Sequence, residues 1–186
     1  MKKYNIDSGE VLVLIALKWF VENPYDEIYI REFSRVLKIS PNSAQRFLNL
    51  FLRNRWINEI KRGNLRCFKS NLESVVFRQL KIIFSLNGIE NSGMIDYFKE
   101  SGVSNLIVFG SVAKGLDDPK SDLDILIVSV NKKMDFRKFE EKIGKEIQAY
   151  IFTWAEWKKQ ALNNKAFYQD VIKDGIALIG DKPLVD

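Results

Sequence analysis

Two aspartates within an apolar stretch are the residues of this sequence best placed to do chemistry. Asp122 and Asp124 interrupt the run SDLDILIV at residues 121–128, which otherwise predicts a buried strand. Side chains alternate along a strand, so both carboxylates are expected on the same face. Two such carboxylates repel each other and resist burial, and a divalent cation between them would relieve the repulsion.

A glycine and a serine end the preceding apolar run. Residues 106–109 (LIVF) predict another buried strand, and Gly110 and Ser111 follow it directly. Gly110 lacks a Cβ and lets another group approach the backbone, while N–H groups and a hydroxyl at the start of a helix can bind phosphate. Lys114 is a further candidate phosphate contact, or a plain surface lysine. An anion site beside an acid pair suits a nucleoside triphosphate with Mg²⁺.

The composition excludes several other chemistries. The 186 residues include no histidine and one cysteine, Cys67. Nucleophiles activated by histidine, His-ligated zinc or haem, disulfides and cysteine-cluster metal sites are therefore excluded. The longest apolar run, residues 11–21, contains Lys18 and is shorter than the ~20 residues that span a bilayer. We predict no signal peptide, a cytoplasmic location and no membrane partner.

The spacing of these residues resembles the nucleotidyltransferases of the DNA polymerase β superfamily, in particular the minimal nucleotidyltransferase group. The family pattern is Gly-Ser, ten residues, then Asp-x-Asp, and the chain matches it without a gap over residues 110–124. Over about residues 90–180 the resemblance implies a mixed β-sheet with flanking helices and two-metal nucleotidyl transfer. It assigns Asp122 and Asp124 to catalysis and to two Mg²⁺ ions. The expected substrate is ATP, and the nucleotide-binding residues would be Gly110, Ser111, Lys114 and Ser121.

The third carboxylate of that family has no clear counterpart. It lies on a later strand, here predicted at residues 146–152, and the matching position is Gln148, which cannot act as an anionic ligand or base. Glu146 projects from the same strand face, so we assign it the third catalytic and metal-binding role. The alternatives are a weakened or inactive site, and a Glu146 that pairs with Lys142 or Lys145.

The first 70 residues follow a different pattern. We predict a helix from Ser8 to about residue 21, a short strand at residues 27–30, and a helix at residues 31–37. A further helix begins with the N-cap Ser40 and with Pro41, and two strands at residues 56–60 and 65–68 follow. The side chains expected to face inward on the first of these helices are Val11, Leu14, Ile15, Trp19 and Phe20, and on the last they are Ala44, Phe47, Leu48 and Phe51.

This order of elements resembles the winged helix-turn-helix family over roughly residues 8–70. The resemblance implies a recognition helix in the major groove of double-stranded DNA and a basic wing. Residues 1–85 carry a net charge of +7 and residues 86–186 a net charge of −2, and a basic surface attracts phosphate. Protein binding and a homodimer are the open alternatives for such a domain. The expected DNA contacts are Asn42, Ser43, Gln45, Arg46, Asn49, Lys61 and Arg62.

The remaining segments are assigned no chemistry. We predict a bridging helix at residues 72–86 with Lys81 outside, and a joint at residues 87–93, where turn-forming residues interrupt the helical pattern. Asp117 and Asp118 are expected in a solvated turn beside Pro119. Two C-terminal helices, at residues 154–160 and 166–173, are expected to place in the core Trp154, Trp157, Leu162, Phe167 and Val171.

The sequence therefore predicts an α+β protein of two domains. A winged helix-turn-helix domain at residues 1–70 would be joined by a bridging segment at residues 71–89 to a polymerase-β-like nucleotidyltransferase domain at residues 90–186. The expected function is Mg²⁺-dependent transfer of a nucleoside monophosphate to an unidentified acceptor. The alternative is a DNA-binding transcriptional regulator or an antitoxin-like protein with a helical toxin-like partner, whose nucleotidyltransferase domain senses nucleotide or is inactive.

Overall fold

The chain divides into two compact units, residues 1–80 and 81–186. The structure, a computed structural model, describes residues 8–131 and 133–185. The division falls inside one helix, α4 (Val75–Asn91). Within the described ranges, no helix is both long and apolar enough to cross a lipid bilayer.

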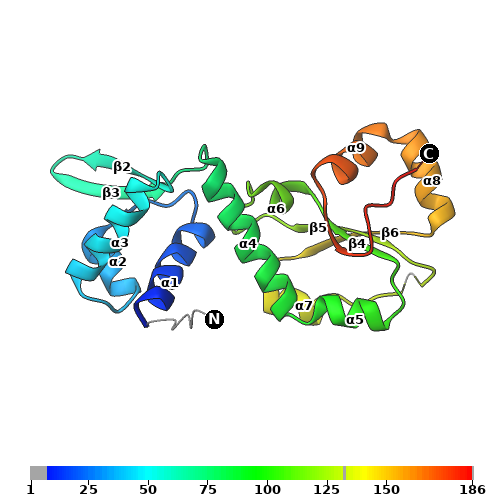
Figure 1. Cartoon of the computed structure of the whole chain (residues 1–186), viewed down its shortest axis with the longest axis horizontal. Helices are drawn as coiled ribbons and strands as arrows, with labels where there is room; N and C mark the ends of the chain where they lie inside the picture. The colour runs from blue at the N-terminus through cyan, green and yellow to red at the C-terminus, as the bar shows by residue number, and fades with distance from the viewer. Residues whose placement is uncertain (1–7, 132, 186) are drawn as a thin grey trace, which may run out of the picture. The chain divides into compact units, whose positions relative to one another are not determined.

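Among its described residues, the N-terminal unit contains three helices, the start of α4 and a small antiparallel sheet (Figure 1). Its elements are α1 (Ser8–Glu22), β1 (Ile28–Tyr29), α2 (Ile30–Val36), α3 (Pro41–Arg53), β2 (Ile57–Arg62) and β3 (Leu65–Ser70). The strands lie in the order β1-β3-β2. The predicted order of elements is confirmed, but the hairpin turn is tighter than predicted. Lys61 and Arg62 belong to β2, and the turn consists of Gly63 and Asn64.

The buried face of α1 differs from the predicted one. Leu14 and Ile15, expected inside, are 56% and 48% exposed. The helix is apolar around most of its circumference, so its periodicity does not select a face, and packing in the folded unit decides it. The side chains of Ser8 and Val11 lie outside the described residues. The buried side chains of α1 are Ala16, Leu17, Phe20 and Val21.

Local sequence signals predict α3 well. The Ser40 hydroxyl accepts a hydrogen bond from the Ser43 N–H at 3.1 Å, and Pro41 is the first helical residue. Three of the four expected core side chains are fully buried, and Phe47 is half-buried. The polar face of α3 therefore points away from the core of this unit.

The C-terminal unit is built on a four-stranded mixed sheet, as expected. Its further elements are α5 (Met94–Glu100), β4 (Asn105–Val108), α6 (Gly110–Lys114), β5 (Leu123–Val128), α7 (Arg137–Ile143), β6 (Ile147–Phe152), α8 (Trp154–Asn163), α9 (Lys165–Asp174) and β7 (Ile176–Ile179). The strand order is β6-β5-β4-β7, with β5 and β6 parallel and the other pairs antiparallel. Helix α7 was not predicted.

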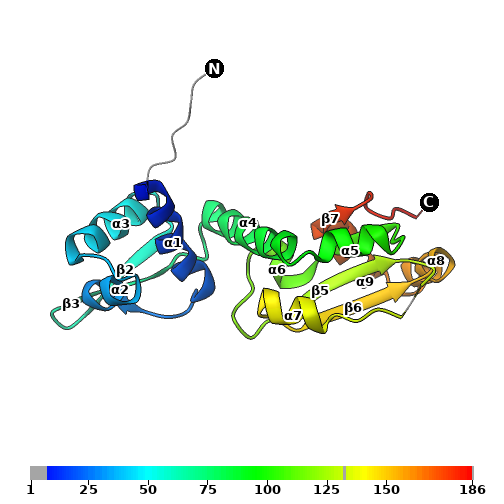
Figure 2. The same ribbon diagram turned by 90° about the horizontal axis from the view of Figure 1, so that it is seen from below.

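Helices cover both faces of this sheet. α8 and α9 lie on one side and α5 and α7 on the other (Figure 1), and Figure 2 looks onto the α5 and α7 side. Trp157 of α8 and Val171 of α9 are buried against Leu126 and Val128 of β5. Two residues expected in the core, Trp154 and Leu162, are instead 42% and 70% exposed, because they lie on the outer side of α8.

The predicted joint at residues 87–93 is wrong. α4 continues through Gly88 to Asn91. Ile89 is 1% exposed and packs in the same cluster as Met94 and Phe98 of α5. A glycine inside a helix costs about 1 kcal/mol, while fully burying an isoleucine side chain contributes about 1.5–3 kcal/mol. Tertiary burial of Ile89 therefore outweighs the local breaking signal.

A buried ion cluster holds the loop between α6 and β5. Lys81, expected outside, is 1% exposed, and its Nζ lies 3.3 Å from Asp117 Oδ1. Asp117, expected in solvent, is 6% exposed and also pairs through Oδ2 with Lys145 Nζ at 3.2 Å. Burial lowers the pKa of Lys81, and the Asp117 carboxylate opposes that shift. Sequence composition suggested a turn here, but it could not reveal two lysines from distant segments.

We predict that Asp117→Ala strongly destabilises the C-terminal unit. Removing one partner of a buried ion pair leaves its counter-charges uncompensated, which typically costs about 3–5 kcal/mol. The measurement is urea denaturation of the full chain followed by tryptophan fluorescence. The control is Glu59→Ala, which breaks an exposed ion pair with Arg66 and should have a much smaller effect because solvent screens that pair. Equal shifts of the two midpoints would contradict the prediction.

Candidate functional site

The predicted chemical residues meet at one edge of the C-terminal sheet. β4 ends at Val108 and pairs antiparallel with β5, which begins at Leu123. The segment that follows β4 and the segment that precedes β5 therefore lie at the same edge. β6 runs parallel to β5 and begins there as well, with Ile147 opposite Leu123.

The carboxylate of Asp124 lies directly against the backbone of Gly110. Gly110 is the first residue of α6 and has a φ of +70°. A Cβ added there would collide with Asp124 Oδ2 and lie 3.0 Å from Asp124 Cγ. The Phe109 N–H also donates to the Asp124 carbonyl at 3.0 Å. Only glycine leaves room for this approach, so the glycine and the aspartate of the motif depend on each other.

Asp122 and Asp124 carry like charges close together, and no positively charged side chain among the described residues forms an ion pair with either. Asp124 is half-buried in β5, whereas Asp122 precedes that strand and is exposed, which corrects the predicted strand start at residue 121. Burial raises the pKa of Asp124, and the negative charges of Asp122 and Asp170 raise it further. No described side chain donates a hydrogen bond to either carboxylate of the pair. This arrangement favours a bound cation.

Lys114, at the end of α6, pairs with two acids of α9. Its Nζ lies 2.5 Å from Asp170 Oδ1 and 3.3 Å from Asp174 Oδ2. The hydrogen bond that Lys114 donates to the Asp170 carboxylate raises the pKa of Lys114, which favours its charged form. The sequence analysis missed both acids. Their spacing of four residues, which places them on one helix face, was the available signal.

The two serines of the motif lie in different environments. Ser111 is half-buried in α6, and no side chain caps the first turn of that helix. The Ser121 hydroxyl accepts a hydrogen bond from the Asp118 N–H at 2.9 Å and lies 3.1 Å from Asp118 Oδ1. Ser121 is therefore engaged within its own loop. Lys145 braces that loop by donating to the carbonyls of Asp118 and Ser121 at 2.6 and 3.1 Å.

The neutral Gln148 lies beside Asp124. The two residues face each other across the parallel pair of β5 and β6. Glu146 precedes β6, its side chain is exposed, and its carbonyl accepts a hydrogen bond from the Leu123 N–H at 2.8 Å. Lys142 and Lys145 donate to backbone carbonyls instead of pairing with it. Among the described residues, no three acidic or cysteine side chains are grouped closely enough to hold a metal ion.

Some of the expected DNA-contacting side chains of the N-terminal unit are exposed, and others form hydrogen bonds within the unit. Asn42 and Arg46 are exposed on α3, and Lys61 is exposed on β2. Arg62 forms two hydrogen bonds with Glu27, at 3.0 and 2.7 Å. Three further polar contacts involve the remaining α3 residues: Ser43 with Ser40, Gln45 with Asn49, and Arg53 with the Asn49 carbonyl.

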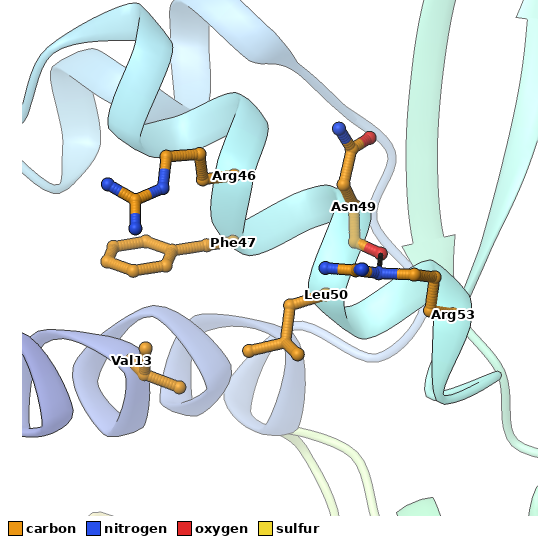
Figure 3. A pocket seen from close by; sticks show the side chains of 6 residues that line it. All are labelled: Val13, Arg46, Phe47, Asn49, Leu50 and Arg53. Carbon is orange, nitrogen blue, oxygen red and sulfur yellow. Dashed lines mark hydrogen bonds between the residues drawn. The ribbon is translucent and has the colours of Figure 1, made fainter.

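A shallow hollow of about 320 Å³ lies between α1 and α3 (Figure 3). Val13, Phe47 and Leu50 form its apolar part, and the polar side chains around it come from α3. The figure shows Arg46 at one end and Arg53 at the other. The exposed cations of α3 therefore border an apolar surface.

Comparison with known proteins finds a family likeness in the C-terminal unit. Residues 92–174 match the family model of the nucleotidyltransferase domain. The match begins just before α5 and ends with α9, so it contains Gly110, the acid pair and both α9 acids. No curated protein matches the chain. The segment is thus similar to a class of domain that generally uses a nucleoside triphosphate and a divalent metal.

We predict that Gly110→Ala destabilises the protein beyond ordinary backbone strain. Gly102 also has a positive φ, of +73°, but a Cβ there meets open space, so Gly102→Ala measures the cost of an alanine in left-handed conformation, about 1–2 kcal/mol. Gly110→Ala should cost about 1–3 kcal/mol more, because the methyl group overpacks against Asp124. Thermal and urea denaturation measure both.

A double-mutant cycle isolates the contact. In an Asp124→Ala background, Gly110→Ala should lower the free energy of unfolding by no more than Gly102→Ala does. If Gly110→Ala costs the same with and without the Asp124 carboxylate, the proposed dependence between glycine and aspartate is wrong.

Proposed function

We propose that the C-terminal unit is a Mg²⁺-dependent nucleotidyltransferase that moves a nucleoside monophosphate, expected from ATP, to an acceptor hydroxyl. The observation that carries this proposal is the Asp124 carboxylate held against the Gly110 backbone, beside Asp122 and without a described counter-ion. A pair of carboxylates at the start of a short helix brings cation ligands and phosphate-binding N–H groups to one place.

The residues present fit a divalent cation. Asp122 and Asp124 offer the oxygen ligands that Mg²⁺ prefers, and the electrostatic cost at Asp124, seen in its raised pKa, would be relieved by positive charge. When bound, such a cation stabilises the charge on the attacking oxygen and on the leaving pyrophosphate. The hydroxyl of Ser111 and the ammonium group of Lys114 are the proposed side-chain contacts of the triphosphate.

The proposed step is an in-line displacement. The acceptor oxygen forms a bond to the α-phosphorus, and the bond from that phosphorus to the bridging oxygen breaks. Pyrophosphate leaves with the electron pair, and the proton of the acceptor hydroxyl is released to water. Positioning and charge neutralisation carry most of the catalysis in such reactions, which agrees with a site made of acids, a lysine and backbone groups.

We expect the full chain to transfer label from an α-³²P nucleoside triphosphate to itself or to an acceptor in a cell extract. Replacing Asp122 and Asp124 together by Asn should lower labelling at least about 100-fold, because the metal supplies several kcal/mol of stabilisation. Asp96→Asn, an exposed change on α5, is the control and should label normally. Equal labelling by the double variant would refute the enzyme proposal.

A second candidate function is favoured by the neutral Gln148 beside Asp124. In this case the C-terminal unit binds nucleotide without transferring it, and the chain is a DNA-binding regulator or an antitoxin-like protein with a helical partner. Saturable nucleotide binding without any labelling would support this candidate over the enzyme.

We further propose that the N-terminal unit is a winged helix-turn-helix domain that binds double-stranded DNA. Two observations support it: α3 is capped by Ser40 and presents Asn42 and Arg46 to solvent, and the β2–β3 hairpin follows it in the chain. Arg62 is committed to Glu27, so we assign the main phosphate attraction to Arg46 and Lys61.

We predict that Arg46→Ala weakens duplex binding more than Arg62→Ala does. Arg46 is exposed, whereas the charge of Arg62 is largely neutralised by Glu27. Losing one phosphate contact should reduce the slope of log affinity against log salt by about 1. Fluorescence anisotropy at several salt concentrations measures this.

The matched variant for this comparison is Glu27→Gln, which should strengthen binding by freeing Arg62. DNA affinity that is unchanged in all three variants would contradict the assignment of these residues.

A further inference from the structure

Four carboxylates and one ammonium group gather about α6. Asp124 touches its first residue, Lys114 is its last, and Asp170 and Asp174 pair with Lys114. Together with Asp122, this group carries a net charge of −3. A bound triphosphate would add further negative charge, so it could bind beside these carboxylates only together with cations.

Helix α9 packs on the same sheet face that carries Asp124. Side chains alternate along β5, so Asp124 shares its face with Leu126, and Leu126 is buried in one cluster with Val171 of α9. The end of α9 is pressed onto β4, since a Cβ at Gly175 would lie 2.7 Å from Ile107 Cγ2. Asp170 precedes Val171 and therefore belongs to the helix that packs on this face of the sheet.

Two contacts with α6 place Asp170 close to the acid pair. Asp124 lies against Gly110, and Asp170 bonds to Lys114, one turn further along the same helix. Glu146, by contrast, precedes β6 and its side chain is exposed. Asp170 is thus linked, through Lys114, to the same short helix that the Asp124 carboxylate contacts.

We propose that Asp170 supplies the third carboxylate of the cation site, from helix α9 instead of the strand position occupied by Gln148. The inference rests on the proposed nucleotidyl transfer and deepens it. Lys114 holds Asp170 while no nucleotide is bound. The triphosphate competes for that ammonium group, and once Lys114 turns to phosphate, an oxygen of Asp170 is free to bind the cation beside Asp122 and Asp124.

The test measures Mn²⁺ binding rather than turnover. The full chain is titrated with Mn²⁺ in the presence of a nonhydrolysable ATP analogue, and free Mn²⁺ is quantified by its electron paramagnetic resonance signal. Asp170→Asn should lower Mn²⁺ affinity at least about tenfold, the scale on which loss of a supporting group weakens metal sites. Asp174→Asn, which removes the other partner of the same lysine, is the matched control and should bind nearly as wild type.

Two further variants separate a lost ligand from a damaged fold. Gln148 faces Asp124 across the sheet, so Gln148→Asp in the Asp170→Asn background restores a third carboxylate on the same face and should recover Mn²⁺ affinity. Glu146→Gln should leave Mn²⁺ affinity unchanged.

Each outcome decides a different point. Wild-type affinity in Asp170→Asn, or a loss in Glu146→Gln alone, overturns the assignment of Asp170 while leaving the proposed nucleotidyltransferase intact. Failure of the wild-type chain to bind Mn²⁺ with the nucleotide analogue would instead refute the proposed function itself.

Discussion

The close approach of a carboxylate to a helix start is the constraint on which the candidate site depends. Asp124 can lie against α6 only because Gly110 has no side chain and adopts a positive φ. That contact sets the distance between the acid pair and the N–H groups of the short helix. Burial and the negative charges of Asp122 and Asp170 raise the pKa of Asp124, and a bound cation would relieve this electrostatic cost. The same group of negative charges therefore destabilises the ionised Asp124 and forms the proposed cation site.

Buried charges then hold the loop that carries the rest of the motif. Lys81 and Lys145 come from segments 64 residues apart in the chain, and both pair with Asp117. Lys145 also binds two backbone carbonyls of the same loop. Exposed pairs such as the one between Arg62 and Glu27 contribute little to stability, but a pair removed from water is intolerant of losing a partner. Asp122 therefore follows a loop that has little freedom to move.

Local sequence signals predicted the positions of helices and strands better than they predicted which side chains are buried. The cap at Ser40 and the apolar stripe of α3 depend on neighbours within a few positions. The cap is found as predicted, and three of the four side chains of the stripe are fully buried. The prediction of the buried face of α1 was wrong because the periodicity of an evenly apolar helix does not indicate which face is buried. Lys81 and Asp117 were misplaced for the opposite reason, since charged residues are expected in solvent unless a distant partner compensates them.

The sequence by itself determined the motif, because the Gly-Ser turn and the two aspartates are separated by a short segment whose length limits where they can meet. The apolar runs on either side of the motif also predicted its two buried strands, whereas the mixed sheet was implied by the family resemblance. Only the tertiary structure decided which acids surround Lys114, since Asp170 lies 56 residues further along the chain and reaches it through the packing of α9 on the sheet. Periodicity specifies which face of a helix is apolar, but the partner of that face depends on the shape and volume of the whole core.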